Sequence, residues 1–96
     1  MGKHELLKIL ENYKKNNAKK YGILELGVFG SAARNEMTIN SDIDIVIKTE
    51  TPDPFQIIHI KEDLENIFNR PVDIVRYRRS MNLLLQRRIN QDAVYV

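Results

Sequence analysis

Residues 27–47 read GVFGSAARNEMTINSDIDIVI and contain the most informative residue spacing in the chain. This stretch opens as an apolar run that ends in Gly30-Ser31 and then passes into a short helical segment, as a strand followed by a helix does. Ten residues later, Asp42 and Asp44 open a second apolar run that reaches Ile47. With average residue usage, this spacing arises by chance in about one chain in a thousand. It joins a turn suited to phosphate with two carboxylates suited to a metal ion.

Hydrophobic periodicity and turn residues predict the elements around this stretch. An amphipathic helix that starts near Leu6 is expected to end near Asn16-Asn17 or at Lys20. Asp53-Pro54 is typical of a helix N-cap followed by proline in the first turn, and Pro71 stops that helix. The remaining predicted elements are strands at Ile23–Phe29, Ile43–Ile47 and Val72–Val75, a helix capped by Ser80, and a short edge strand at Ala93–Val96.

The two later helices each show an apolar face. In the first, one side is predicted to carry Ile57, Ile60 or Lys61, Leu64, Ile67 and Phe68. In the second, the corresponding residues are Met81, Leu84, Leu85 and Ile89.

The positions of the polar residues predict the topology. Gly30-Ser31 lies where its strand ends, whereas Asp42 and Asp44 lie where theirs begins, so one shared site requires antiparallel strands. Asp73 also opens its strand, and the helix between predicts a parallel crossover. We expect an α/β (α+β) fold, in which helices pack on a small mixed sheet of three or four strands.

Length and composition limit the classes of function. The 96 residues predict a single domain, 1–96, with no separate substrate domain. There is no cysteine, so a disulfide framework or thiolate metal site is excluded. No stretch resembles a membrane span, and we expect a cytoplasmic protein. The net charge of +2 is slight, and we do not expect nucleic-acid binding.

The carboxylates suit a hard divalent cation. Asp42 and Asp44 are two apart in a strand, so they point to the same face, and Asp73 on the next strand can stand beside them. Clustered carboxylates repel one another unless a cation neutralises them, and oxygen ligands suit Mg²⁺ or Mn²⁺. Gly30 lets the backbone approach a phosphate, to which the Ser31 hydroxyl can donate. This combination is typical of metal-assisted phosphoryl or nucleotidyl transfer.

Other interpretations of the same residues stay open. Asp42 and Asp44 alone fit an ordinary solvated strand start. A phosphatase with an aspartate nucleophile is disfavoured, because its carboxylates follow the apolar strand. Arg34 fits a phosphate contact or a solvated helix residue equally well. Ser41 fits a turn residue whose hydroxyl bonds locally, or a phosphate contact.

Residues 30–34 and 41–47 resemble the signature of the DNA polymerase β-like nucleotidyltransferase superfamily. The short length and the later Pro71–Val75 segment are similar to its minimal nucleotidyltransferase (MNT) branch. Strong matching covers residues 27–75. Members of this branch act as the antitoxin of a HEPN/MNT toxin–antitoxin pair, in a hetero-oligomer with the HEPN-domain toxin. Asn35 departs from the common pattern, which has glycine there, but asparagine tolerates a left-handed backbone.

The resemblance implies the following roles. Asp42, Asp44 and Asp73 bind two Mg²⁺ ions, or Mn²⁺, and form the catalytic set. Gly30 and Ser31 hold the ATP phosphates, with Arg34 and Ser41 as further phosphate contacts. AMP is then transferred from ATP to a hydroxyl, a tyrosine of the partner toxin in this branch.

Two alternatives to that function remain. One is a non-catalytic antitoxin that neutralises its partner by complex formation. The other is transfer to a small molecule or an RNA end. The positive segment Arg76–Arg79 fits a solvated surface, a triphosphate contact or the docking of an acidic partner.

Overall fold

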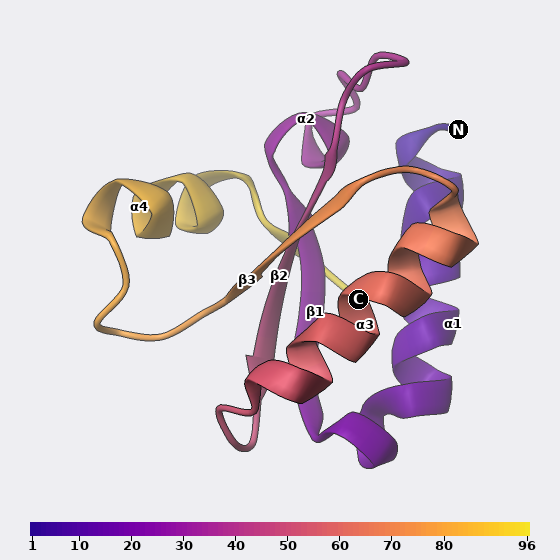
Figure 1. Cartoon of the computed structure of the whole chain (residues 1–96). Coiled ribbons are helices and arrows are strands. Elements are labelled where there is room, and N and C mark those ends of the chain that lie inside the picture. The colour runs from indigo at the N-terminus through magenta and orange to yellow at the C-terminus, as the bar shows by residue number, and fades with distance from the viewer.

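The computed structural model describes all of residues 1–96 as four helices around a four-stranded sheet (Figure 1). Their order along the chain is α1 (Lys3–Tyr21), β1 (Ile23–Phe29), α2 (Gly30–Ala33), β2 (Ile43–Thr49), α3 (Pro54–Phe68), β3 (Val72–Arg76), α4 (Leu83–Asp92) and β4 (Val94–Tyr95).

The sheet has the strand order β3-β2-β1-β4. β2 runs antiparallel to β1 and parallel to β3, so both predicted pairings are confirmed. β4 pairs antiparallel with β1 as a short edge strand, also as predicted. The register sets Phe29 beside Asp44 and Asp44 beside Asp73. The mixed α/β fold class is therefore confirmed.

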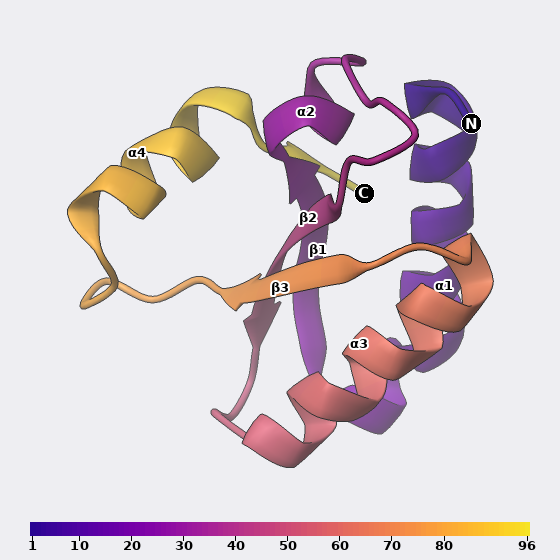
Figure 2. The ribbon, with the colours of Figure 1, turned by 45° about the horizontal axis from the view of Figure 1, so that its top comes forward.

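The two faces of the sheet are covered unequally. α1 and α3 lie together on one side, and α4 lies apart from them (Figure 2). The α1/α3 side holds a core cluster of 16 buried residues, among them Ile43, Ile45 and Ile47 of β2. The α4 side holds a cluster of three buried residues, Phe29, Val46 and Ile89. Because alternate residues of a strand face opposite sides, Asp44 shares the α4 side with Val46.

Local capping explains where the helices begin and end. The side chain of Asp53 accepts hydrogen bonds from the backbone N–H groups of Phe55 and Gln56, which confirms the predicted start of α3. α1 ends at Tyr21, one residue after the later of its two predicted ends, Lys20, and the left-handed backbone of Gly22 closes it. The start of α4 was predicted wrongly. The cap of α4 is Asn82 and not Ser80, because Asn82 accepts from the N–H groups of Leu84 and Leu85.

The predicted apolar faces are correct only in part. Ile60, Leu64 and Phe68 are buried under the sheet, as expected. Ile67 is 49% exposed and Leu84 is 71% exposed, so neither contributes to a core. β2 and β3 are each longer than predicted, since pairing continues to Thr49 and Arg76.

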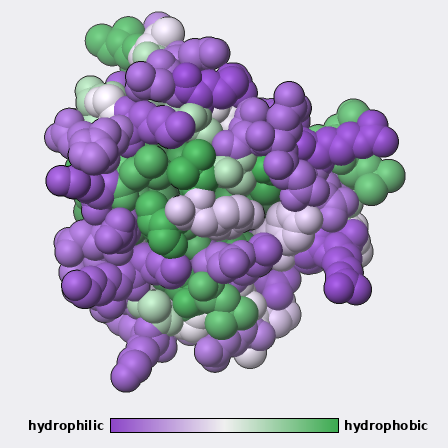
Figure 3. Space-filling model, turned by 180° about the vertical axis from the view of Figure 1, so that it is seen from behind, coloured by the Kyte–Doolittle hydropathy of each residue, from purple (hydrophilic) through white to green (hydrophobic).

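The surface combines hydrophilic side chains with scattered apolar groups. Viewed from behind, most atoms are hydrophilic, and apolar atoms gather near the centre of the view (Figure 3). The large apolar side chains with the greatest exposure are Ile39, Phe55, Leu83 and Leu84. None of the helices is both long and apolar enough to span a bilayer.

Candidate active site

Asp44 and Asp73 form the centre of the candidate site. They are direct partners on the parallel strands β2 and β3, whose backbones lie about 4.8 Å apart. Asp42 precedes β2 by one residue and is exposed, as is Asp73. Asp44 is half-buried. The predicted meeting of Asp44 and Asp73 at one edge of the sheet is confirmed.

The pKa of Asp44 is raised above its ordinary value. Burial is the largest cause, and the neighbouring charges of Asp73 and, more weakly, Asp42 add to it. Arg88 and Arg34 oppose this effect, because a nearby positive charge favours the ionised carboxyl. Asp44 is thus held among like charges that a bound cation would relieve.

Gly30 shapes the turn beside Asp44. Its φ of +67° lies in the left-handed region, which residues other than glycine rarely adopt. A Cβ atom at this position would collide with the Asp44 carboxylate. The turn continues as α2, a single helical turn in which Ser31 is half-buried. The backbone of the turn can therefore lie directly against the carboxylate.

Asn35 closes this turn, as the sequence predicts. Its φ is +57°, the left-handed conformation that asparagine tolerates. Its N–H donates to the Ala32 carbonyl at 3.3 Å, and its side-chain oxygen accepts from the Lys3 N–H at 3.2 Å.

Arg34 is paired within the protein. Its guanidinium contacts Glu36 at 3.3 Å and Asp92 of α4 at 2.6 Å, and its side chain is 46% exposed. It thereby ties the turn after α2 to the end of α4. A phosphate contact by Arg34 stays a prediction.

Ser41 bonds locally, which agrees with the turn interpretation. Its hydroxyl accepts from the Thr38 N–H at 2.9 Å and lies 3.1 Å from the Thr38 hydroxyl. A phosphate contact by Ser41 likewise stays a prediction.

Arg70 is a positioning residue that the sequence analysis missed. It lies two residues beyond α3, and its guanidinium donates to the carbonyls of Thr38 and Ser41, at 3.0 and 3.2 Å. These bonds hold the loop that leads into Asp42. No local pattern signals this role, because the partners lie about thirty residues away in the chain.

Arg88 was predicted only as an addition to a positive patch, and the structure brings it to the carboxylates. It lies 5.9 Å from the centre of the Phe29 ring. It lines a hollow of about 390 Å³ together with Asp44, Asp73 and Lys61. The site therefore combines two carboxylates with two cations from α3 and α4, a mixture suited to anionic phosphates and their counterions.

The carboxylates of the site fit a divalent cation that takes its remaining ligands from water or a substrate. No three acidic, histidine or cysteine side chains are arranged as a complete protein metal site. Mg²⁺ is usually held by one or two carboxylates, with water and substrate phosphates as its other ligands. Asp44, with Asp42 or Asp73, supplies such carboxylates.

A family match covers nearly all of the residues that form this fold and site. The family model described as "Polymerase beta, Nucleotidyltransferase" matches residues 6–96. The chain belongs to this nucleotidyltransferase family, whose members generally use divalent metal ions.

Two proteins of similar sequence are named as protein adenylyltransferases. A Methanocaldococcus jannaschii protein, provisionally named a protein adenylyltransferase, is 36% identical over 93 residues, which cover 96% of this chain and 95% of that protein. The Thermococcus cleftensis protein adenylyltransferase MntA is 33% identical over 93 residues, with 96% and 93% covered.

Solved structures agree with the fold. A protein provisionally described as a minimal nucleotidyltransferase matches with a TM-score of 0.78 and 25% identity, covering 98% of this chain and 95% of that one. A chain of a toxin–antitoxin complex with AMP-PNP matches with a TM-score of 0.72 and 23% identity, covering 88% and 70%. A chain from the complex of a tri-AMPylated Shewanella oneidensis HEPN toxin with its MNT antitoxin matches with a TM-score of 0.65 and 20% identity, covering 93% and 70%.

Proposed function

We propose that this chain transfers AMP from ATP to a tyrosine hydroxyl of a partner HEPN toxin and thereby acts as an antitoxin. The observation that carries the proposal is the register of Asp44 beside Asp73, with Gly30 packed against Asp44. The relatives named protein adenylyltransferases support the choice of a protein as the acceptor. We further propose that residues 1–96 act as one domain in the cytoplasm, in a hetero-oligomer with the toxin.

On the donor side, the turn at Gly30 and Ser31 would hold the β- and γ-phosphates of ATP. The absence of a side chain at Gly30 keeps the backbone within reach of both the phosphates and Asp44. Asp42 and Asp44, with Asp73, would hold two Mg²⁺ ions, or Mn²⁺. When bound, these ions neutralise phosphate charge and polarise the reacting phosphoryl group. Arg34 and Ser41 remain our proposed additional phosphate contacts.

On the acceptor side, Asp73 would accept the proton of the attacking hydroxyl. Asp73 is exposed on an edge strand, so an acceptor can reach it from solvent. The hydroxyl oxygen forms a bond to the α-phosphorus as the bond to the bridging oxygen breaks, and pyrophosphate leaves. The product carries AMP in a phosphodiester bond, and Asp73 releases its proton to water.

The direct test uses purified components. Wild-type protein, Mg²⁺, ATP labelled at the α-phosphate and the HEPN-domain protein proposed as its partner are expected to give a labelled HEPN protein. ATP labelled at the γ-phosphate is the matched control and should leave it unlabelled, because pyrophosphate departs. Label from the γ-phosphate would indicate a kinase and contradict the proposal.

Neutralisation by binding alone is the second candidate function. The arginines of the segment Arg76–Arg79 favour it, because Arg78 and Arg79 are exposed and none of the three has an acidic partner. The Asp42→Asn variant separates the two candidates in cells that express the toxin. Protection equal to that of the wild type would support binding alone, whereas lost protection with an intact complex supports transfer.

A further inference from the structure

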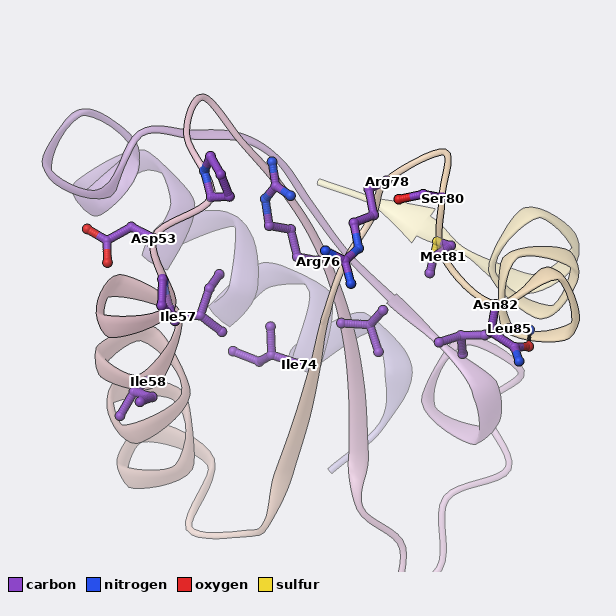
Figure 4. Close-up of a pocket in the computed structure, with 13 residues that line it drawn as sticks. Asp53, Ile57, Ile58, Ile74, Arg76, Arg78, Ser80, Met81, Asn82 and Leu85 are labelled. Carbon is purple, nitrogen blue, oxygen red and sulfur yellow. Dashed lines mark hydrogen bonds between the residues drawn. The ribbon is translucent and has the colours of Figure 1, made fainter.

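A groove of about 690 Å³ lies next to the proposed catalytic carboxylates, and none of these carboxylates lines it. Its walls are the start of α3, the end of β3, and the segment that leads into α4 (Figure 4). Ile57 and Ile58 line one side, and Met81 and Leu85 line the other, with Ile74 between them.

The groove is continuous with the site. The smaller hollow that contains Asp44 and Asp73 shares with the groove the five lining residues Ile57, Ile58, Ile74, Val75 and Leu85. Asp73 is the second residue of β3 and Arg76 is its last. Three residues of strand span about 10 Å, so the groove leads away from the carboxylates by that distance.

The far end of the groove is positive. Arg76 and Arg78 line it, and Arg79 follows in the exposed segment. None of the three ion pairs in the chain involves these arginines. Arg76 donates only to the Thr49 hydroxyl, at 3.0 Å. The one acidic lining residue, Asp53, is engaged as the cap of α3. The positive charge is thus available to an acidic ligand.

The backbone beside the groove is also available. β3 is at the end of the strand order, so one of its edges has no strand partner in the chain. Exposed strand edges commonly receive an extended peptide, whose side chains then enter the neighbouring pockets. The apolar lining favours a protein segment over RNA, because the groove has no aromatic residue on which a base could stack.

We infer that this groove docks the acceptor as an extended, acidic protein segment. The segment places its hydroxyl at Asp73, apolar side chains over Ile58 and Leu85, and carboxylates at Arg76 and Arg78. An extended peptide covers the distance from Asp73 to Arg76 in about three residues, and reaches Arg78 in about five if it continues along the same path. The acceptor tyrosine therefore has acidic residues about four positions away. The inference rests on the proposed transfer to a protein hydroxyl.

Synthetic peptides test the inference without catalysis. Each fluorescent twelve-residue peptide carries one tyrosine and two glutamates, placed four and five positions either before or after it. Matched peptides carry lysines in place of the glutamates. Fluorescence anisotropy with the metal-free protein, without ATP, is expected to show about fivefold tighter binding of one glutamate peptide than of its lysine match. The difference should shrink in high salt.

Charge reversal at the groove sharpens the test. Arg78→Glu is expected to abolish or invert the preference, whereas Lys15→Glu, an exposed reversal on α1 outside the groove, should leave it unchanged. Equal binding of both peptides, or binding of neither, overturns the inference. So does displacement of the peptide by an oligouridylate, or a loss of ATP affinity in Arg78→Glu without a loss of peptide affinity. Failed labelling in the transfer assay would instead reject the proposed function and leave the peptide preference intact.

Discussion

The two faces of the sheet differ in what they bury. The face under α1 and α3 is an extended apolar core, whereas the face under α4 buries three apolar residues and carries Asp44 and Asp73. Adjacent residues of β2, such as Ile45 and Val46, therefore belong to different clusters. One side of this small sheet holds most of the buried apolar residues, and the other side is therefore free to hold charges whose burial is costly.

The largest expected effect is the loss of transfer in Asp44→Asn. We expect AMP transfer to fall on the order of 10³-fold or more, because the amide can neither balance a cation nor replace its oxygen ligand. The same substitution should raise the free energy of unfolding at neutral pH. Because the pKa of Asp44 is raised in the folded state, that state binds more protons than the unfolded state, and the wild type loses stability as the pH rises through that pKa.

Urea unfolding of wild type and Asp44→Asn between pH 4 and pH 7 measures this dependence. The variant should gain on the wild type as the pH rises above about 4, the usual pKa of an unfolded aspartate. A variant that is equally destabilised at every pH would show that Asp44 serves the core and not the site.

Two isoleucines, one from each face, test the division of stability. Ile45 and Ile89 are both fully buried, one in the large cluster and one in the small. Ile45→Ala is expected to cost about 4 kcal/mol of unfolding free energy, and Ile89→Ala about 2 kcal/mol, because α4 can settle into the space. Chemical denaturation measures both. Equal costs would contradict the unequal roles of the two faces.

Two glycines with similar left-handed backbone conformations distinguish the effect of backbone strain from the effect of a collision with Asp44. Gly22 and Gly30 have φ values of +63° and +67°. The left-handed backbone alone should make alanine cost about 1–2 kcal/mol in stability at either position. Only at Gly30 does the new Cβ meet Asp44, since at Gly22 the nearest atom is 3.6 Å away. We expect transfer to fall about 100-fold in Gly30→Ala and to persist in Gly22→Ala. Similar transfer rates in both variants would refute the close packing of the turn on Asp44.

The smallest expected effect concerns Arg88. The positive charge of Arg88 partly opposes the rise in the pKa of Asp44. Arg88→Gln removes that charge and should therefore raise this pKa further. Arg87→Gln is the matched control, because Arg87 does not line the hollow of the carboxylates. Carboxyl ¹³C NMR titration of the metal-free proteins measures the shift. An unchanged pKa of Asp44 in Arg88→Gln would show that the charge of Arg88 does not act on the site.

The central sheet was predictable because chemistry and periodicity agree there. β1 has the predicted bounds, and the shared site of Gly30, Asp44 and Asp73 implied the strand directions correctly. Roles that depend on distant partners were not predictable. Arg34 meets Asp92 and Arg70 meets Ser41 across 58 and 29 residues of sequence.

The start of α4 shows a different limit. Serine and asparagine are both good caps, so Ser80 and Asn82 are locally equivalent, and the hydrogen bonds from Leu84 and Leu85 decide between them. Periodicity likewise places Ile67 and Leu84 on apolar faces, but it does not say how wide a stripe the sheet covers.

Intact mass spectrometry of the HEPN-domain protein proposed as the partner, co-expressed with this chain, measures the transfer itself. We predict a mass higher by one or more whole AMP units with the wild-type chain, and the unmodified mass with Asp44→Asn. An unmodified HEPN protein beside an active wild-type antitoxin, or the same added mass with Asp44→Asn, would contradict it.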